Sequence, residues 1–442
     1  MDWSKLPDLG AVALLTCAFA SVARRSYAQV SGLWLTGWVM ISLHFAAFMF
    51  LPAPGAFGIM AEFIGLTALI WAGVLFMWAA VPYHGKISSR YMLVILLGTN
   101  ALYVGLLTIG RDAFWALTPA AALFCLLPLM LALVSLRQLN HPLRWVTVIL
   151  YSALSVFLLV IQHRSGSGAD LALNAVLFTV YFDCSIHFWN AYRRASAGAF
   201  VTIAGFLAWA GVFVVAPAIA AFSPNLHLES EVWNLPKYVV AVGMILLLLE
   251  DQIEHNKFLA LHDELTGLPN RRLFQDRLAS ALERARRTGA QTALLLIDLD
   301  HFKQVNDTLG HHVGDQLLKR VAGLFSERVR RTDTVARTGG DEFAIILEEP
   351  TTRQDAERVG HSLIRLLSEP LELDNRSVRV GASIGVAVFP EDALTTESLC
   401  IAADLRMYSD KNDSRQLGQL AHLPPASKRL FAVKTPTGLF RG

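Results

Sequence analysis

The chain has 442 residues, of which 54% are hydrophobic and only 17% are charged, and its formal net charge is +2. Soluble domains carry about 25% charged residues, so this composition argues against a chain that is soluble along its whole length. The small net charge indicates no particular partner, and we expect no nucleic-acid binding. The four cysteines of the chain are scattered and lack C-x-x-C spacing, which argues against a zinc site or a disulfide framework. They are Cys17, Cys125, Cys184 and Cys400.

The first 250 residues contain long segments with few or no charged residues. A helix that crosses a bilayer needs about 20 mainly apolar residues, and the sequence predicts nine such spans. The first and last segments are the shortest, so eight spans are the alternative. The segments are 9–23, 32–51, 57–81, 91–109, 113–136, 145–161, 171–190, 198–222 and 233–249.

Basic residues between these segments predict the orientation. If the C-terminal half is cytoplasmic, nine spans place the N-terminus outside, and basic residues then concentrate in the inner loops, as the positive-inside rule requires. The inner ones are Arg24, Arg25, Lys86, Arg90, Arg137, Arg144, Arg193 and Arg194, against Arg111 and Arg164 outside. We expect an integral membrane protein with its C-terminal half in the cytoplasm.

Residues 1–250 are interpreted as a membrane sensor domain that contains a few polar residues. Asp183 and His187 are four residues apart, so they share a helix face. They either line a cavity for a small ligand, metal or proton, or form a packing pair inside the membrane. His44 and Glu62 also fall inside predicted spans. Interface anchors are expected at Trp34, Trp38, Trp189 and Trp233.

The composition changes sharply after residue 249. Leu246, Leu249, Ile253, Asn256 and Ala260 follow a 3-4-3-4 spacing, which is typical of a short coiled-coil seam or of an ordinary amphipathic helix end. Residues 251–262 are therefore expected to form a helical signalling linker. The final segment, 417–442, contains two consecutive prolines and scattered basic residues, and it is expected to be a flexible tail.

The second half alternates between helical and strand patterns, which predicts an α/β domain. Helical patterns cover 275–287, 314–329 and 399–411, and strand patterns cover 292–299, 334–337, 343–347 and 378–389. Gly339 and Gly340 between two strands predict a tight hairpin. The fold class is thus an all-α membrane bundle followed by an α/β (α+β) domain, for which we expect a mixed sheet.

Carboxylates cluster at the ends of these strands. Asp298 and Asp300 end a buried strand, and Asp341 and Glu342 follow the glycines. One carboxylate at the strand end and the two after the glycines could converge on a magnesium ion, which prefers a few carboxylates together with substrate phosphates. The glycines would let a nucleotide approach the backbone. The alternative is an ordinary hairpin with solvated acidic residues at its tip.

Five sequence blocks follow one another in this half. They read DELTGLPNRR at 263–272, DLDHFK at 298–303 (followed by Asn306-Asp307, Gly310-His311 and Gly314-Asp315), RTGGDEF at 337–343, ASIGVA at 382–387, and Ala403-Asp404 to Tyr408 and Lys411. In this order they resemble the GGDEF-domain diguanylate cyclases, with a nucleotide-cyclase-like domain at 263–416. The sequence departs from the family pattern at Thr338 and at 413–416 (DSRQ), the segment that contains Arg415.

The resemblance implies a reaction and its metal. A homodimer would condense two GTP molecules into cyclic di-GMP and two pyrophosphates, using Mg²⁺ or Mn²⁺ and regulated through the membrane domain. Asp298, the Leu299 carbonyl and Asp341 would hold the metal, and Glu342 and Lys303 would act with Asp341 at the reacting centre.

The resemblance also implies substrate and product sites. Asn306 and Asp315 would bind guanine, Gly339 and Gly340 would accommodate the nucleotide, and Lys303, Lys411 and Arg415 would neutralise the triphosphate. Arg330 and Asp333 form an R-x-x-D pattern that five residues separate from Gly339, at the place where the family binds its inhibitory product. The alternatives are a nonenzymatic cyclic di-GMP receptor and a transporter with a regulatory cytoplasmic domain.

Overall fold

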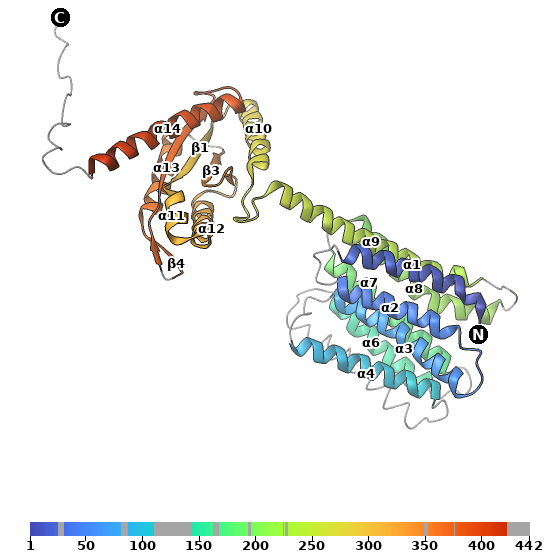
Figure 1. The fold of residues 1–442 in the computed structure, drawn as a ribbon. Coiled ribbons are helices and arrows are strands. Elements are labelled where there is room, and N and C mark those ends of the chain that lie inside the picture. The colour runs from blue at the N-terminus through green and yellow to red at the C-terminus, as the bar shows by residue number, and fades with distance from the viewer. Residues whose placement is uncertain are drawn as a thin grey trace, which may run out of the picture. The chain divides into compact units, whose positions relative to one another are not determined.

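The computed structural model describes residues 1–24, 31–80, 87–109, 143–161, 168–192, 196–223, 225, 229–348, 352–374 and 376–421. The chain divides into two compact units, Met1–Glu254 and His255–Gly442. The long helix α9 (Ser230–Leu261) begins in the first unit and ends in the second (Figure 1).

The N-terminal unit consists of helices. A 3-10 turn, η1 (Trp3–Lys5), precedes α1 (Leu6–Ala23), α2 (Ser31–Phe48), α3 (Ala56–Ala79), α4 (Ile87–Ile109), α6 (Leu143–Ile161), α7 (Gly168–Ala191), α8 (Ala197–Phe222) and α9. In the described ranges, seven helices are long and apolar enough to cross a membrane, and α6 carries a shorter apolar segment. Eight of the nine predicted spans coincide with these helices, whereas span 113–136 lies outside the described residues.

Aromatic side chains fill the centre of this unit. Trp34 stacks on Phe188 with ring centroids 5.6 Å apart, and Tyr181 stacks on Trp209 at 4.0 Å. Trp34 and Trp38 are each only 1% exposed, so their prediction as interface anchors is wrong. Their helix face packs into the bundle, where aromatic burial outweighs the preference of tryptophan for the interface.

Polar residues of the predicted spans make contacts within the bundle. Asp183 is buried and accepts a hydrogen bond from Thr147 Oγ1 at 3.0 Å, which joins α7 to α6. His187 Nδ1 lies 3.4 Å from Asp183 Oδ1. The His44 ring nitrogen Nδ1 lies 2.9 Å from the Gly65 carbonyl of α3. Each of these contacts satisfies a polar group that would otherwise be costly inside an apolar bundle.

The C-terminal unit alternates helices with strands. Its elements are α10 (Arg271–Thr288), β1 (Thr292–Asp300), α11 (Phe302–Leu309), α12 (His311–Arg328), β2 (Thr334–Arg337), β3 (Glu342–Leu347), α13 (Arg353–Ser368), β4 (Leu371–Leu373), β5 (Arg376–Val378), β6 (Gly381–Phe389) and α14 (Thr396–Ala421). Helix α10 starts four residues before the predicted position because the Asn270 side chain caps it, accepting from the Arg272 and Leu273 amides.

The main sheet has the strand order β2-β3-β1-β6, and β4 pairs with β5 alone. All four pairings among the described strands are antiparallel, so the expected mixed sheet is corrected to an antiparallel one. The hairpin forces β2 and β3 to be antiparallel, and β3 lies between β1 and β2. Strands β1 and β2 therefore point the same way without pairing.

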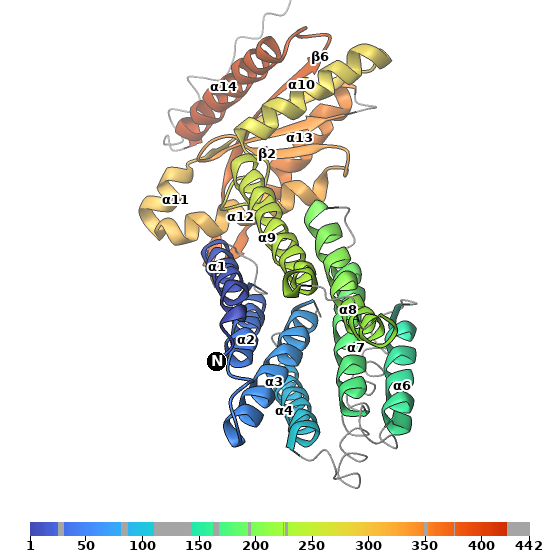
Figure 2. The same cartoon turned by 90° about the vertical axis from the view of Figure 1, so that its right-hand side faces the viewer.

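Helices cover both faces of this sheet (Figures 1 and 2). Side chains alternate along a strand, so Leu295 and Ile297 of β1 pack with Leu317 of α12 and Leu363 of α13. Leu294 points the other way and packs with residues of α10 and α14, including Phe274, Leu278, Leu399 and Ala403. Burial of each large apolar side chain contributes about 1.5–3 kcal/mol, and the two packed faces fix β1 and its last residues.

Candidate functional site

The hairpin between β2 and β3 presents two glycines. Glu342 accepts hydrogen bonds at its backbone oxygen from the Thr338 amide at 2.9 Å and the Gly339 amide at 3.4 Å. A Cβ atom on Gly339 would lie 2.5 Å from Glu342 Oε2 and 3.0 Å from its Cδ. The carboxylate of Glu342 therefore lies over the backbone of Gly339, and a side chain there would displace it.

Strand pairing brings the end of β1 to this hairpin. Asp298 is the register partner of Glu342, and the Leu299 amide donates to the Asp341 carbonyl at 3.2 Å. The Asp298 side chain is only 13% exposed, and Lys411 Nζ of α14 donates to its Oδ1 at 2.6 Å. Residues more than a hundred positions apart thus gather carboxylates and an ammonium group at one end of the central strands.

The donor atoms suit a hard divalent cation. Asp298, the Leu299 carbonyl and Asp341 are all oxygen donors, which Mg²⁺ and Mn²⁺ prefer. Among the residues that the structure describes, no group of three or more His, Cys, Asp or Glu forms a complete protein cage. A magnesium site with two carboxylates and substrate phosphates does not need such a cage, so the residues fit the metal.

Helices α11 and α12 bring the two predicted guanine-binding residues together. They join at Gly310, whose φ of +88° a side chain would strain. The Asn306 side chain lies directly against Gly314, so a Cβ on Gly314 would overlap Asn306 Oδ1. Asp315 is the next residue and is exposed. The Asn306 amide therefore lies against the residue that directly precedes Asp315.

Two further phosphate-binding candidates lie on helices that border the site. Lys303 is exposed on α11. Arg415 lies one helical turn beyond Lys411 on α14, and its side chain is outside the described residues.

An ion pair that sequence reasoning missed supports the hairpin. Arg337 Nη1 donates to both carboxylate oxygens of Asp263 at 2.9 and 3.0 Å, while its Nε and Nη2 donate to the Gly340 carbonyl at 3.1 and 2.7 Å. Thr266 also donates to Asp263 through its amide and hydroxyl. Partial burial raises the pKa of Asp263, but the hydrogen bonds from Thr266 and Arg337 outweigh this and hold the pKa below its ordinary value of 3.8.

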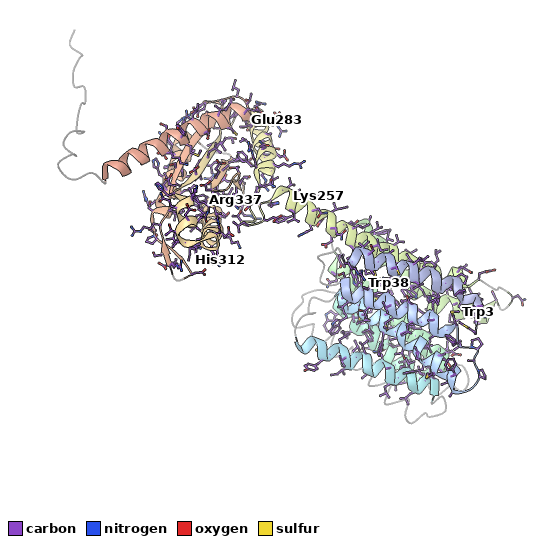
Figure 3. The ribbon with its side chains drawn as sticks, in the orientation of Figure 1. Trp3, Trp38, Lys257, Glu283, His312 and Arg337 are labelled. Carbon is purple, nitrogen blue, oxygen red and sulfur yellow. The ribbon has the colours of Figure 1, made fainter. Side chains whose placement is uncertain are left out.

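We call the ion pair of Arg337 and Asp263 the hairpin clamp. It connects the end of α9 to the two glycines of the hairpin. Asn270 Nδ2 donates to the Ala260 carbonyl of α9 at 2.9 Å, and the Arg337 amide donates to the Pro269 carbonyl at 2.9 Å. Figure 3 labels Arg337 between the sheet and the loop after α9. The signals in the sequence were the arginine two residues before the first hairpin glycine and the DELT block, but neither indicates the other as its partner.

The predicted product site lies at the turn before β2. Arg330 is exposed, and Asp333 accepts from the Arg330 amide at 2.9 Å and from the Glu348 amide at 3.1 Å. The aspartate carboxylate therefore stabilises the turn itself. The Arg330 guanidinium belongs to an exposed side chain, so it is the accessible group of this pair.

Comparisons with known proteins match this C-terminal unit. The family model described as "Diguanylate cyclase, GGDEF domain" matches residues 260–417. The bifunctional diguanylate cyclase/cyclic di-GMP phosphodiesterase MucR of Pseudomonas aeruginosa is 41% identical over 194 residues, which are 40% of this chain and 28% of MucR. The diguanylate cyclase TpbB of the same species is 40% identical over 176 residues, which are 40% of each chain.

A solved structure of the TpbB GGDEF domain alone is 42% identical, with a TM-score of 0.34, and covers 34% of this chain and 89% of that chain. The chain thus spans well under half of the length of the two curated relatives it matches.

Proposed function

We propose that this chain, whose residues 260–417 belong to the diguanylate cyclase GGDEF-domain family, condenses two GTP molecules into cyclic di-GMP. The observation that carries the proposal is the strand pairing that sets Asp298 opposite Glu342, with Lys411 on the Asp298 carboxylate. Carboxylates suit a hard cation, and the ammonium group suits phosphate oxygens. A nucleoside triphosphate with its cation needs both.

The chemistry is nucleotidyl transfer performed twice. The 3′-hydroxyl oxygen of one GTP bonds to the α-phosphorus of the other, the bond to the leaving pyrophosphate breaks, and the hydroxyl proton is lost. Mg²⁺ or Mn²⁺, held by Asp298, Asp341 and the Leu299 carbonyl, would supply charge stabilisation. Glu342 acts at the same centre. The phosphates are neutralised by Lys303, Lys411 and Arg415, and guanine is bound by Asn306 and Asp315.

Synthesis requires two domains because each holds one GTP. The cytoplasmic end of α9 offers a surface for pairing two chains, since Leu249 is 39% and Ile253 52% exposed and Asn256 and Ala260 continue the stripe. A parallel seam of two α9 helices would bury these residues. We propose a homodimer on this basis, with 251–262 as the signalling linker, 263–416 as the catalytic domain and 417–442 as a flexible tail.

The helices of residues 1–250 support a membrane-embedded sensor. Asn234 of α9 donates to Asp8 of α1, and further along both helices Gln252 donates to the Val22 carbonyl, so α1 and α9 run parallel. A chain whose first and last spans are parallel crosses the membrane an odd number of times, which favours nine spans over eight. With the catalytic domain in the cytoplasm, the N-terminus then lies outside a bacterial inner membrane.

The Gly314→Ala variant should bind GTP more weakly without losing its fold. The new methyl group would overlap Asn306 Oδ1 and push the amide away from guanine. A lost hydrogen bond at a buried polar group costs about 1–3 kcal/mol, so the KM for GTP should rise about five- to 150-fold, as in Asn306→Ala. Gly323→Ala on the same helix meets open space and should leave KM unchanged. Equal KM values in both glycine variants would contradict the assigned guanine site.

The Arg330→Ala variant should escape product inhibition. An exposed guanidinium can bind phosphate or guanine in a bidentate way, and cyclic di-GMP held there would keep two domains apart. Progress curves with added cyclic di-GMP should show wild type slowed and Arg330→Ala little affected, with similar initial rates. Arg331→Ala, a neighbouring exposed arginine, is the control and should stay inhibited. Equal slowing of all three proteins would show that Arg330 does not bind the inhibitory product.

Mass spectrometry separates the cyclase from the two alternatives. Full-length protein in lipid nanodiscs is incubated with GTP and magnesium, and the nucleotides are then identified. A cyclase converts GTP into cyclic di-GMP, whereas a receptor retains added cyclic di-GMP without consuming GTP. A transporter with a regulatory domain would do neither in nanodiscs. The retained hairpin acids, Asp341 and Glu342, favour synthesis.

A further inference from the structure

A chain of buried polar side chains joins the first and last helices of the N-terminal unit. Asn234 Nδ2 of α9 donates to Asp8 Oδ2 of α1 at 2.8 Å, and Tyr238 donates to Asp8 Oδ1 at 3.2 Å. Lys237 Nζ donates to Asn234 Oδ1 at 2.5 Å. Asp8 is 3%, Asn234 6% and Lys237 8% exposed. We call Asp8, Asn234 and Lys237 the α1–α9 tether.

The tether lies where four helices meet. The Lys237 ammonium lies 4.6 Å from the ring centroid of Phe45 on α2 and 5.8 Å from that of Trp209 on α8. Cation–π contacts of this kind are strongest where the cation and the ring are desolvated. Ionisable residues inside apolar helices are costly and are retained mainly where they have a function. We therefore expect the tether to have a function besides packing.

Helix α9 needs support at this place. Pro236 lies inside the helix, between two tether residues, and a proline removes one backbone hydrogen bond and favours a kink. The tether braces the helix on both sides of this weak point. Another contact, from Gln252 to Val22, lies 18 residues further along, about 27 Å at 1.5 Å per residue.

Helix α9 then continues to the hairpin clamp. It ends at Leu261, Asn270 binds the Ala260 carbonyl, and Arg337 connects the following loop to Gly340. A rotation or shift of α9 at the tether would therefore reach the loop that supports the hairpin. Two catalytic domains must meet in one orientation to react. If α9 were held less firmly, a smaller fraction of domain pairs would have that orientation.

We infer that the α1–α9 tether consists of positioning residues that hold α9 in the arrangement in which the two catalytic domains meet productively. This inference rests on the proposed synthesis of cyclic di-GMP. Three variants of the full chain in lipid nanodiscs test it: Lys237→Met, the triple variant Asp8→Leu/Asn234→Leu/Lys237→Met, and Thr147→Val as the control. The control removes a buried hydrogen bond between α6 and α7 of similar length, 3.0 Å.

The triple variant separates positioning from stability. Lys237→Met removes the buried ammonium group that donates to Asn234 Oδ1 and should lower the melting temperature, whereas an apolar replacement of a whole buried polar and charged cluster is often neutral or stabilising. We expect the triple variant to melt like wild type, with a kcat at least fivefold lower and a KM for GTP within twofold. Thr147→Val should keep the wild-type kcat. A triple variant with wild-type or higher kcat would overturn the inference.

A readout without GTP distinguishes this inference from the proposed function. Cysteines at Val22→Cys and Gln252→Cys should be cross-linked efficiently by a short bismaleimide in the otherwise wild-type chain, and at least threefold less in the triple variant. If the chain makes no cyclic di-GMP but the cross-link yield still falls, the tether positions α9 and the proposed function is wrong. An unchanged yield in the triple variant would mean that the tether does not hold α9.

Discussion

The Asp298→Asn variant should lose at least about a thousandfold in cyclic di-GMP synthesis, because loss of transition-state charge stabilisation by a cation is worth several kcal/mol. The substitution removes one of the two carboxylates that would hold the metal and weakens the contact with Lys411 Nζ. The side chain keeps its size, so the C-terminal unit should stay folded. Initial rates by chromatography and a thermal melt measure the two effects separately.

Asp341→Asn should show a similar loss, because it removes the other carboxylate. Asp300→Asn is the matched control: it lies on the same strand and would keep its hydrogen bond from Ser383 Oγ. Its rate should fall less than about tenfold, since the lost charge is not at the metal. If Asp298→Asn kept a rate comparable to that of Asp300→Asn, the metal assignment would be wrong.

The Arg337→Met variant should lose about a hundredfold in kcat and about 2–4 kcal/mol of stability. Arg337 is 12% and Asp263 24% exposed, so the substitution leaves a largely buried carboxylate without its guanidinium. The Gly340 carbonyl loses two donors, and the hairpin glycines would move relative to Asp298. Urea unfolding monitored on the C-terminal unit and steady-state kinetics are the measurements.

Arg284→Met is the matched control for this clamp. Arg284 pairs with Glu348 at 2.6 Å but is 46% exposed, and exposed pairs contribute about 0–1 kcal/mol. The pH dependence gives a further check. Because the folded-state pKa of Asp263 lies below 3.8, its contribution is present above that pH and is lost as the pH falls through the folded pKa. The stability gap between wild type and Asp263→Asn should therefore close in acid.

Local patterns predicted most of the elements. The buried strand at 292–299 follows from an apolar run, the hairpin from two adjacent glycines, and the eight spans on described helices from the length of apolar segments. Each of these signals depends on neighbouring residues alone. The sheet pairing did not follow, because β3 is inserted between β1 and β2 by contacts distant in sequence. Trp34 and Trp38 were placed wrongly at the interface because apolar composition does not tell which face of a helix meets lipid and which meets protein.

The candidate site was predicted from the resemblance more than from local chemistry. Acidic residues at a strand end and beside two glycines indicated a cation, and β1–β3 pairing supports that interpretation by setting Asp298 opposite Glu342. The clamp between Asp263 and Arg337 was missed because the two residues are 74 positions apart. Asp8 and Lys237 were missed for the same reason, although Lys237 is a charged residue inside a predicted span.

The stoichiometry of the products tests the central claim most directly. Full-length wild type in lipid nanodiscs is incubated with GTP and magnesium, and cyclic di-GMP and pyrophosphate are quantified together over time. The account predicts two pyrophosphates for each cyclic di-GMP, at a rate that Asp298→Asn reduces to background. Unconsumed GTP, or GTP converted to GDP and inorganic phosphate without cyclic di-GMP, would contradict it.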